Sequence, residues 1–168
     1  AMDDTNNAGA NSAGSNNNIA IGANALGGTW ANAVSEFNVA IGTNSMAGAL
    51  NAATNNTAVG YFSLNAITSG DNNIGIGSEA GGSLTSGIKN TIMGVQAGDA
   101  MTSTKYTTLI GYQAGTAINS TDADGTVAIG YQALQDLTSG QNSVAVGYRA
   151  LADLTTGDYN TAVGYAAL

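Results

Sequence analysis

A block of about 17 residues, marked by one glycine, recurs nine times and constrains the fold more than any other feature of the chain. Clear copies read Asn-Thr-Ala-Val-Gly-Tyr at 56–61 and 160–165, and Ser-Val-Ala-Val-Gly-Tyr at 143–148. Successive marker glycines are 20, 18, 17, 17, 17, 19, 17 and 17 residues apart, so 17 is the period and the longer intervals contain insertions. The nine repeat glycines are Gly22, Gly42, Gly60, Gly77, Gly94, Gly111, Gly130, Gly147 and Gly164.

Each position of the repeat, numbered here from its glycine as position 0, has its own chemistry. Position −4 is Asn, Thr or Ser, position −3 is β-branched, position −2 is Ala in six copies, and position −1 is Ile or Val except at Met93. Position +3 is Ala or Ser, and position +7 is apolar from the third copy on. β-Branched residues that alternate with small ones predict a strand, and the recurring glycine allows the positive φ of a tight turn.

A unit of this length cannot bury its own apolar face and must stack on its neighbours. Helical repeats need about 33 residues or more, so a helical solenoid is the weaker interpretation. We therefore predict an all-β fold: a parallel β-roll or β-solenoid of nine coils over 16–168, about 40 Å long at a strand spacing of about 4.8 Å. Residues 1–15 are expected to form a linker or an irregular N-terminal cap, and Trp30 to cover the open end of the first coil. The Asn column should form a ladder of side-chain amides.

Residue volumes indicate which face of the strand points inward. Position +4 is Leu or Met in six copies but Gly81, Gly98 and Gly115 in the middle three. In two of those three copies the small residue at −2 has become Ile92 or Leu109, as expected if both positions share one interior space. One copy, with glycine at both positions, does not follow the pattern. The opposite arrangement, with the Ile/Val/Thr/Tyr face as the core, stays open.

If positions −2 and +4 are internal, the other face forms an apolar ribbon along the outside of the roll. Soluble monomers rarely expose so large an apolar patch, and packing against copies of the same chain is the simplest way to cover it. The candidate interface or ligand face consists of Thr57, Val59, Tyr61, Thr91, Thr108, Ile110, Tyr112, Val127, Ile129, Tyr131, Val144, Val146, Tyr148, Thr161, Val163 and Tyr165.

Two sets of repeat motifs resemble those of known families. Asn-Val-Ala-Ile-Gly at 38–42 and Ser-Val-Ala-Val-Gly at 143–147 resemble the head repeat of trimeric autotransporter adhesins of the YadA type. Asn-Thr-Ala-Val-Gly-Tyr followed by Ala-Ala-Leu at 166–168, together with Gln-Ala-Leu at 132–134, is similar to bacteriophage tail-fibre repeats. The resemblance implies a left-handed roll whose three chains pack side by side into a homotrimer. It also implies a non-enzymatic, structural protein of the cell surface or virion that contacts a host receptor or glycan. The 17-residue period is longer than the adhesin unit.

The composition excludes several classes of function. The chain has three basic residues, Lys89, Lys105 and Arg149, against eleven acidic ones, and a net charge of −8, which disfavours nucleic acid and anionic membranes. It has no Cys and no His, so thiol nucleophiles, zinc sites and a Ser-His-Asp triad are excluded. No apolar run approaches the ~20 residues of a membrane span. We predict no catalytic residue, metal or cofactor.

The acidic residues suggest turns more than chemistry. The segment 122–125, Asp-Ala-Asp-Gly, resembles the start of a calcium loop but lacks the remaining ligands, so we interpret it as a solvated turn. Asp136 and Asp153 occupy matching repeat positions, as do Asp71 and Asp158. Such pairs could be read as the two carboxylates of a hydrolase, but solubilising turns explain them more simply.

Threonine columns support a second hypothesis. Thr57, Thr91, Thr108 and Thr161 recur on the strand, and Thr-Ser or Thr-Thr pairs recur at positions +8 and +9. Flat Thr/Ala/Val arrays resemble the surfaces of ice-binding solenoids, whereas Thr-Ser-Gly is also ordinary turn chemistry. The sequence thus predicts a trimeric fibre or adhesin segment, with a monomeric ice-binding solenoid as the alternative.

Overall fold

The computed structural model describes residues 14–30, 33–119 and 121–168, and it is a β-solenoid, as predicted. Nine strands form one parallel sheet in sequence order, and a 3-10 helix, η2 (Thr121–Ala123), lies in the insertion between β6 and β7. Most of the expected linker, residues 1–13, falls outside the described residues. The strands are β1 (Ile19–Ile21), β2 (Val39–Ile41), β3 (Thr57–Val59), β4 (Ile74–Ile76), β5 (Thr91–Met93), β6 (Thr108–Ile110), β7 (Val127–Ile129), β8 (Val144–Val146) and β9 (Thr161–Val163).

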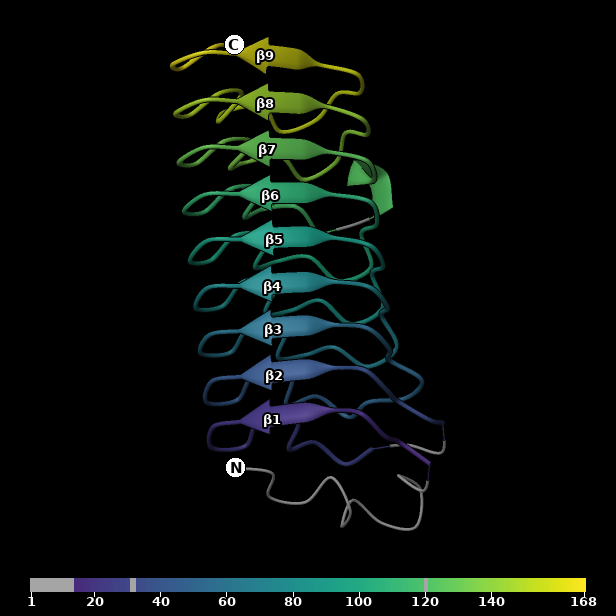
Figure 1. Cartoon of the computed structure of the whole chain (residues 1–168). Helices are drawn as coiled ribbons and strands as arrows, with labels where there is room; N and C mark the ends of the chain where they lie inside the picture. Colours follow the sequence, from purple (N-terminus) through teal and green to yellow (C-terminus); the bar gives the residue numbers. More distant parts are fainter. Residues whose placement is uncertain (1–13, 31–32, 120) are drawn as a thin grey trace.

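Equivalent positions of successive repeats lie directly above one another (Figure 1). Ala40 pairs with Ala58, and Ala128 pairs with Ala145, so the register of the sheet is the register of the repeat. The nine strands are joined by eight turns of the coil. In Figure 1 the strands in the foreground run from right to left while the chain rises from β1 to β9. The repeat glycines are therefore aligned along the axis.

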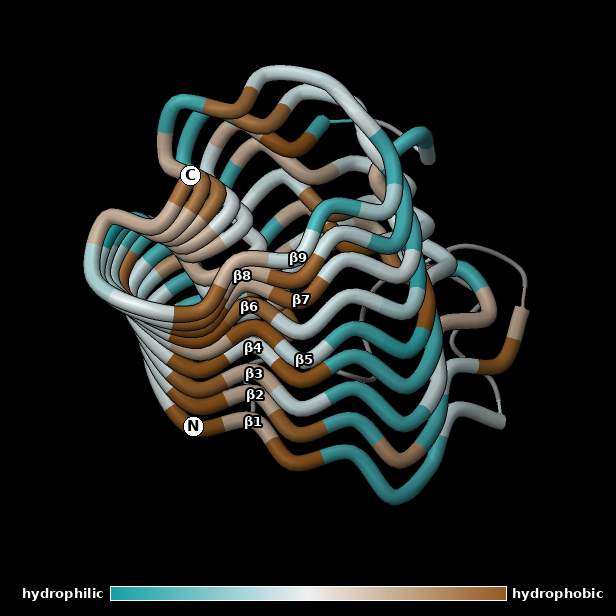
Figure 2. The backbone as a smooth tube through the Cα atoms, turned by 90° about the horizontal axis from the view of Figure 1, so that it is seen from above, coloured by the Kyte–Doolittle hydropathy of each residue, from teal (hydrophilic) through white to brown (hydrophobic). Residues whose placement is uncertain are grey.

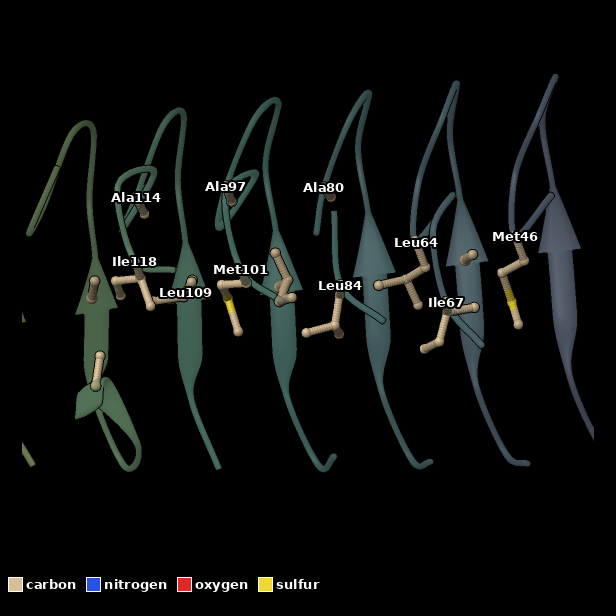
Figure 3. Packing of buried hydrophobic residues seen from close by; sticks show 14 of the residues in the cluster. Met46, Leu64, Ile67, Ala80, Leu84, Ala97, Met101, Leu109, Ala114 and Ile118 are labelled. Atoms are coloured by element: carbon tan, nitrogen blue, oxygen red, sulfur yellow. The ribbon is translucent and has the colours of Figure 1, made fainter. Parts of the chain in front are cut away.

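The core is a narrow column inside the coil. In every strand the middle residue, position −2, is buried, while positions −3 and −1 are partly or largely exposed. Apolar side chains from positions +4 and +7, such as Leu64 and Ile67, pack against it from the opposite wall (Figure 3). The alternative in which the Ile/Val/Thr/Tyr face forms the core is wrong, because Ile19 and Ile21 are 50% and 55% exposed.

Large and small residues compensate each other between neighbouring coils as well as within one coil, where a Cβ on Gly115 would lie 2.9 Å from Cδ2 of Leu109. A Cβ atom on Gly75 would lie 2.7 Å from Cγ of Leu64, which is position +4 of the preceding repeat. A Cβ on Gly81 would lie 2.8 Å from Cδ1 of Ile92, at position −2 of the following repeat. The copy with two glycines does not compensate within itself, and large side chains of the preceding and following copies occupy the space beside its glycines.

The predicted asparagine ladder runs through the interior from Asn18 to Asn90. Oδ1 of Asn56 accepts hydrogen bonds from the backbone N (2.9 Å) and Nδ2 (3.0 Å) of Asn73 in the next coil. Nδ2 of Asn73 also donates to the carbonyl of Gly87 (2.8 Å), which ties the strand to the opposite wall of the coil. Buried amides are thus paired in both directions, as low-dielectric surroundings require.

Trp30 belongs to the core. Its side chain is 2% exposed and its Nε1 donates to the carbonyl oxygen of Leu26 at 3.3 Å. The indole therefore fills the interior next to the first coil, where the insertion after Leu26 brings it inward, and does not lie as an exposed lid.

Candidate binding face

The sixteen residues of the candidate face all lie on the outside of the solenoid, and none is buried. Those at positions −3 and −1 point away from the core because side chains alternate across a strand. Seen along the axis, apolar segments line up from coil to coil on this side of the tube (Figure 2). The face consists of Val, Ile and Thr side chains on the strands, bordered by tyrosines at position +1 in five of the nine repeats.

The last four tyrosines of that border form a stack, here called the tyrosine ladder: Tyr112, Tyr131, Tyr148 and Tyr165. Neighbouring ring centroids are 5.3, 5.1 and 5.1 Å apart, and neighbouring planes differ by 12°, 6° and 6°. The first three rings are 42–44% exposed, and Tyr165 is 80% exposed. Sequence reasoning placed these residues on the face but missed the stack, although tyrosine at the same position in four consecutive repeats was the available signal.

A second ladder, of amides, follows at position +2. Nε2 of Gln132 donates to Oε1 of Gln113 (3.0 Å), and Nε2 of Gln113 donates to Oε1 of Gln96 (3.0 Å). The next residue in this column is Arg149, whose Nη2 lies 3.7 Å from Oδ1 of Asp153. The side chains of this ion pair are 45% and 75% exposed, so it contributes little stability and leaves both groups open to other partners.

Beside the top of the tyrosine ladder the surface is hollowed. The hollow has a volume of about 330 Å³ and is lined by Tyr148, Arg149, Ala152, Asp153, Tyr165, Ala166 and Leu168. It combines aromatic rings with one cationic and one anionic side chain. Such a mixture of apolar surface and a few orienting polar groups is typical of small-ligand sites.

Three of the turn aspartates have structural partners. Oδ1 of Asp71 accepts hydrogen bonds from the backbone N and Oγ1 of Thr54 in the preceding coil, at 2.7 and 3.0 Å. Oδ1 of Asp124 accepts from the backbone N of Lys105, and Oδ1 of Asp158 from that of Gln141. These carboxylates tie neighbouring corners of the coil together. Within the described ranges, no three acidic residues gather closely enough to hold a metal ion.

The environment of Asp99 opposes the charge of its carboxylate. Burial, and then the nearby negative charge of Glu79, raise the pKa of the Asp99 carboxyl. A raised folded-state pKa favours the protonated form, so its contribution to stability is present below the unfolded pKa and is lost as the pH rises through the folded value. Asp99→Asn should therefore raise the urea midpoint slightly at pH 7 and leave it unchanged at pH 3. Exposed Asp136→Asn is the control, and an equal gain there would contradict the assignment.

The threonines at position +8 are used by the fold. The hydroxyls of Thr68, Thr85 and Thr138 donate to the carbonyls of Thr85, Thr102 and Thr155 in the following coils, at 2.9–3.1 Å. This column therefore stabilises turns, in agreement with the turn interpretation. The strand threonines, by contrast, lie on the candidate face.

Comparison with known proteins adds no further constraint, since no protein-family model, curated protein or solved structure matches the chain. In the part of the chain that the structure describes, no helix has the length and apolar character needed to cross a membrane.

Proposed function

We propose that the chain is a non-catalytic structural segment of an extracellular, cell-surface or virion fibre or adhesin head, in which three copies pack side by side. The observation that carries the proposal is the outer strip at positions −3 and −1 of the nine strands, mostly Val, Ile and Thr, which is partly to largely exposed in the single chain. Soluble monomers rarely expose a long contiguous apolar patch, so the strip favours contact with a partner. In Figure 1 the strands in the foreground run from right to left while the chain rises, which is the sense of a left-handed coil. This supports the winding implied by the resemblance.

The rod itself would be stiff and resistant to proteolysis. Backbone hydrogen bonds link each coil to the next at strands and bends alike, as from Gly60 N to Ile41 O (2.8 Å) and from Phe62 N to Thr43 O (3.1 Å). Local opening must break several such contacts together, which raises its free energy. The absence of His and Cys from the sequence removes the commonest general bases and nucleophiles, which supports a mechanical role over a catalytic one.

Oligomeric state tests the proposal. Sedimentation velocity at micromolar concentration should show a trimer for the unmodified chain. The double substitution Ile110→Lys, Ile129→Lys places two charges on the strip in adjacent coils and should give monomers with unchanged circular dichroism, because unpaired charges are excluded from an interface core. The matched control Ser69→Lys, Ser86→Lys adds the same charges at exposed position +9 and should remain trimeric. A monomeric unmodified chain at all concentrations would refute the fibre proposal.

Ice binding remains the second candidate, and the flat column of partly exposed strand threonines, among them Thr91 and Thr108, favours it. It requires this face to be free in solution, so a monomer with thermal hysteresis would support it. A trimer without thermal hysteresis would exclude it.

A further inference from the structure

The tyrosine ladder presents one aromatic ring per coil at a regular spacing along the rod. Its centroids are 5.1–5.3 Å apart, more than the ~3.5–4.0 Å of two surfaces in direct contact. Neighbouring rings are therefore not in full face-to-face contact, and the exposure of 42–80% of the four tyrosines leaves aromatic surface open to solvent. The ladder is an aromatic track four coils long.

We propose that this track, with the hollow at its upper end, binds an uncharged, extended β-1,4-linked polysaccharide that lies parallel to the solenoid axis with one sugar per tyrosine. A pyranose in such a chain has nearly the length of one coil, so each successive sugar meets one ring and presents the C–H groups of its two faces in alternation. This inference rests on the proposed function, a fibre or adhesin head outside the cell. It adds to that proposal the class of ligand that the tyrosine ladder binds.

Other linear polymers fit the track less well. An extended polypeptide repeats at about 3.3 Å per residue, so its side chains fall out of step with the coils. Nucleic acids and acidic polysaccharides are repelled by the net charge of −8, and the charge of Arg149, the basic side chain that lines the hollow, is offset by Asp153 beside it. A neutral sugar chain carries no charge and is not subject to this repulsion.

The hollow supplies the polar contacts that sugar hydroxyls need. Arg149 donates and Asp153 accepts, and their separation of 3.7 Å leaves donor and acceptor capacity on both side chains. Tyr148 and Tyr165 line the same hollow, so ring contact and hydroxyl recognition occur together. We expect a terminal sugar to occupy the hollow and the following units to lie along Tyr131 and Tyr112.

The test is isothermal titration of the full-length protein with cellohexaose, cellobiose and maltohexaose. Cellohexaose should bind, cellobiose should bind at least tenfold more weakly because it covers fewer rings, and maltohexaose should not bind, since its α-1,4 linkage curls the same sugar. Tyr131→Ala should weaken cellohexaose about tenfold by removing one ring from the centre of the track. Tyr131→Phe should retain most of the affinity.

Tyr159→Ala is the matched control, because Tyr159 is 76% exposed and lies outside the ladder, so binding should be unchanged. Absence of cellohexaose binding, equal affinity for maltohexaose, or insensitivity to Tyr131→Ala would overturn the proposal. If Tyr131→Ala instead alters the sedimentation coefficient and no sugar binds, the ladder is an interface between copies. Sedimentation of the unmodified chain is measured separately, so failure of this inference is distinguished from failure of the fibre proposal.

Discussion

Gly111→Ala is expected to destabilise the solenoid by about 4 kcal/mol or more, enough to prevent folding of much of the rod. Gly111 has φ 137°, a conformation that side-chain-bearing residues rarely adopt, which costs about 1–3 kcal/mol. Its added Cβ would also lie 2.2 Å from the carbonyl oxygen of Gly130 in the next coil. That oxygen belongs to a backbone fixed by its own coil, so neither atom can move without separating two coils. Urea unfolding followed by circular dichroism measures the loss.

Gly82→Ala provides the comparison. Gly82 lies in a turn and is not among the glycines with a positive φ. The nearest atom to its added Cβ is the carboxylate Oδ1 of Asp99, at 3.0 Å. This side chain can rotate away, so the cost should stay below about 1 kcal/mol. Similar losses for both substitutions would mean that the aligned glycines do not set the coil spacing.

The spacing of the repeats was sufficient to predict the β-solenoid architecture. Spacing between glycines defined nine strands and their register, and the Asn column predicted the interior ladder, because identical units that stack must place like side chains above one another. The offset between Leu64 and Gly75 was missed, since a linear alignment compares positions within one copy. This contact joins the bend after the strand of one coil, at position +4, to the strand of the next coil.

The bends were less predictable than the strands. Residues at positions +2 and +4 adopt left-handed backbone conformations even where they are not glycine, as in Phe62 (φ 54°) and Leu64 (φ 44°). Local preference disfavours this region for such side chains, and packing of Leu64 into the core together with hydrogen bonds between coils overrides it. The tyrosine ladder depends on the same bends, which is why its members were recognised as surface residues but not as a stack.

Asn73→Ala should cost about 4 kcal/mol without changing any residue on the surface. The truncation removes the acceptor of the Asn90 backbone N–H (3.1 Å) and Nδ2 (3.0 Å), and the donor to the Gly87 carbonyl (2.8 Å). Each buried group left without a partner costs about 1–3 kcal/mol, because the closed coil admits no replacement from solvent. Exposed Asn51→Ala is the control and should change the stability by about 0.5 kcal/mol or less.

Asn73→Asp separates loss of hydrogen bonds from loss of volume. The carboxylate keeps the acceptor for Asn90, but it cannot donate to Gly87, and burial raises its pKa above the unfolded value of about 3.9. The protonated form restores one donor, so the variant should approach the unmodified stability near pH 3 and fall progressively below it as the pH rises. Urea midpoints of this variant, of Asn73→Ala and of Asn51→Asp, measured from pH 3 to pH 7, make the comparison. A pH-independent deficit for Asn73→Asp would show that the amide at this position fills space and that its hydrogen bonds do not hold the coils together.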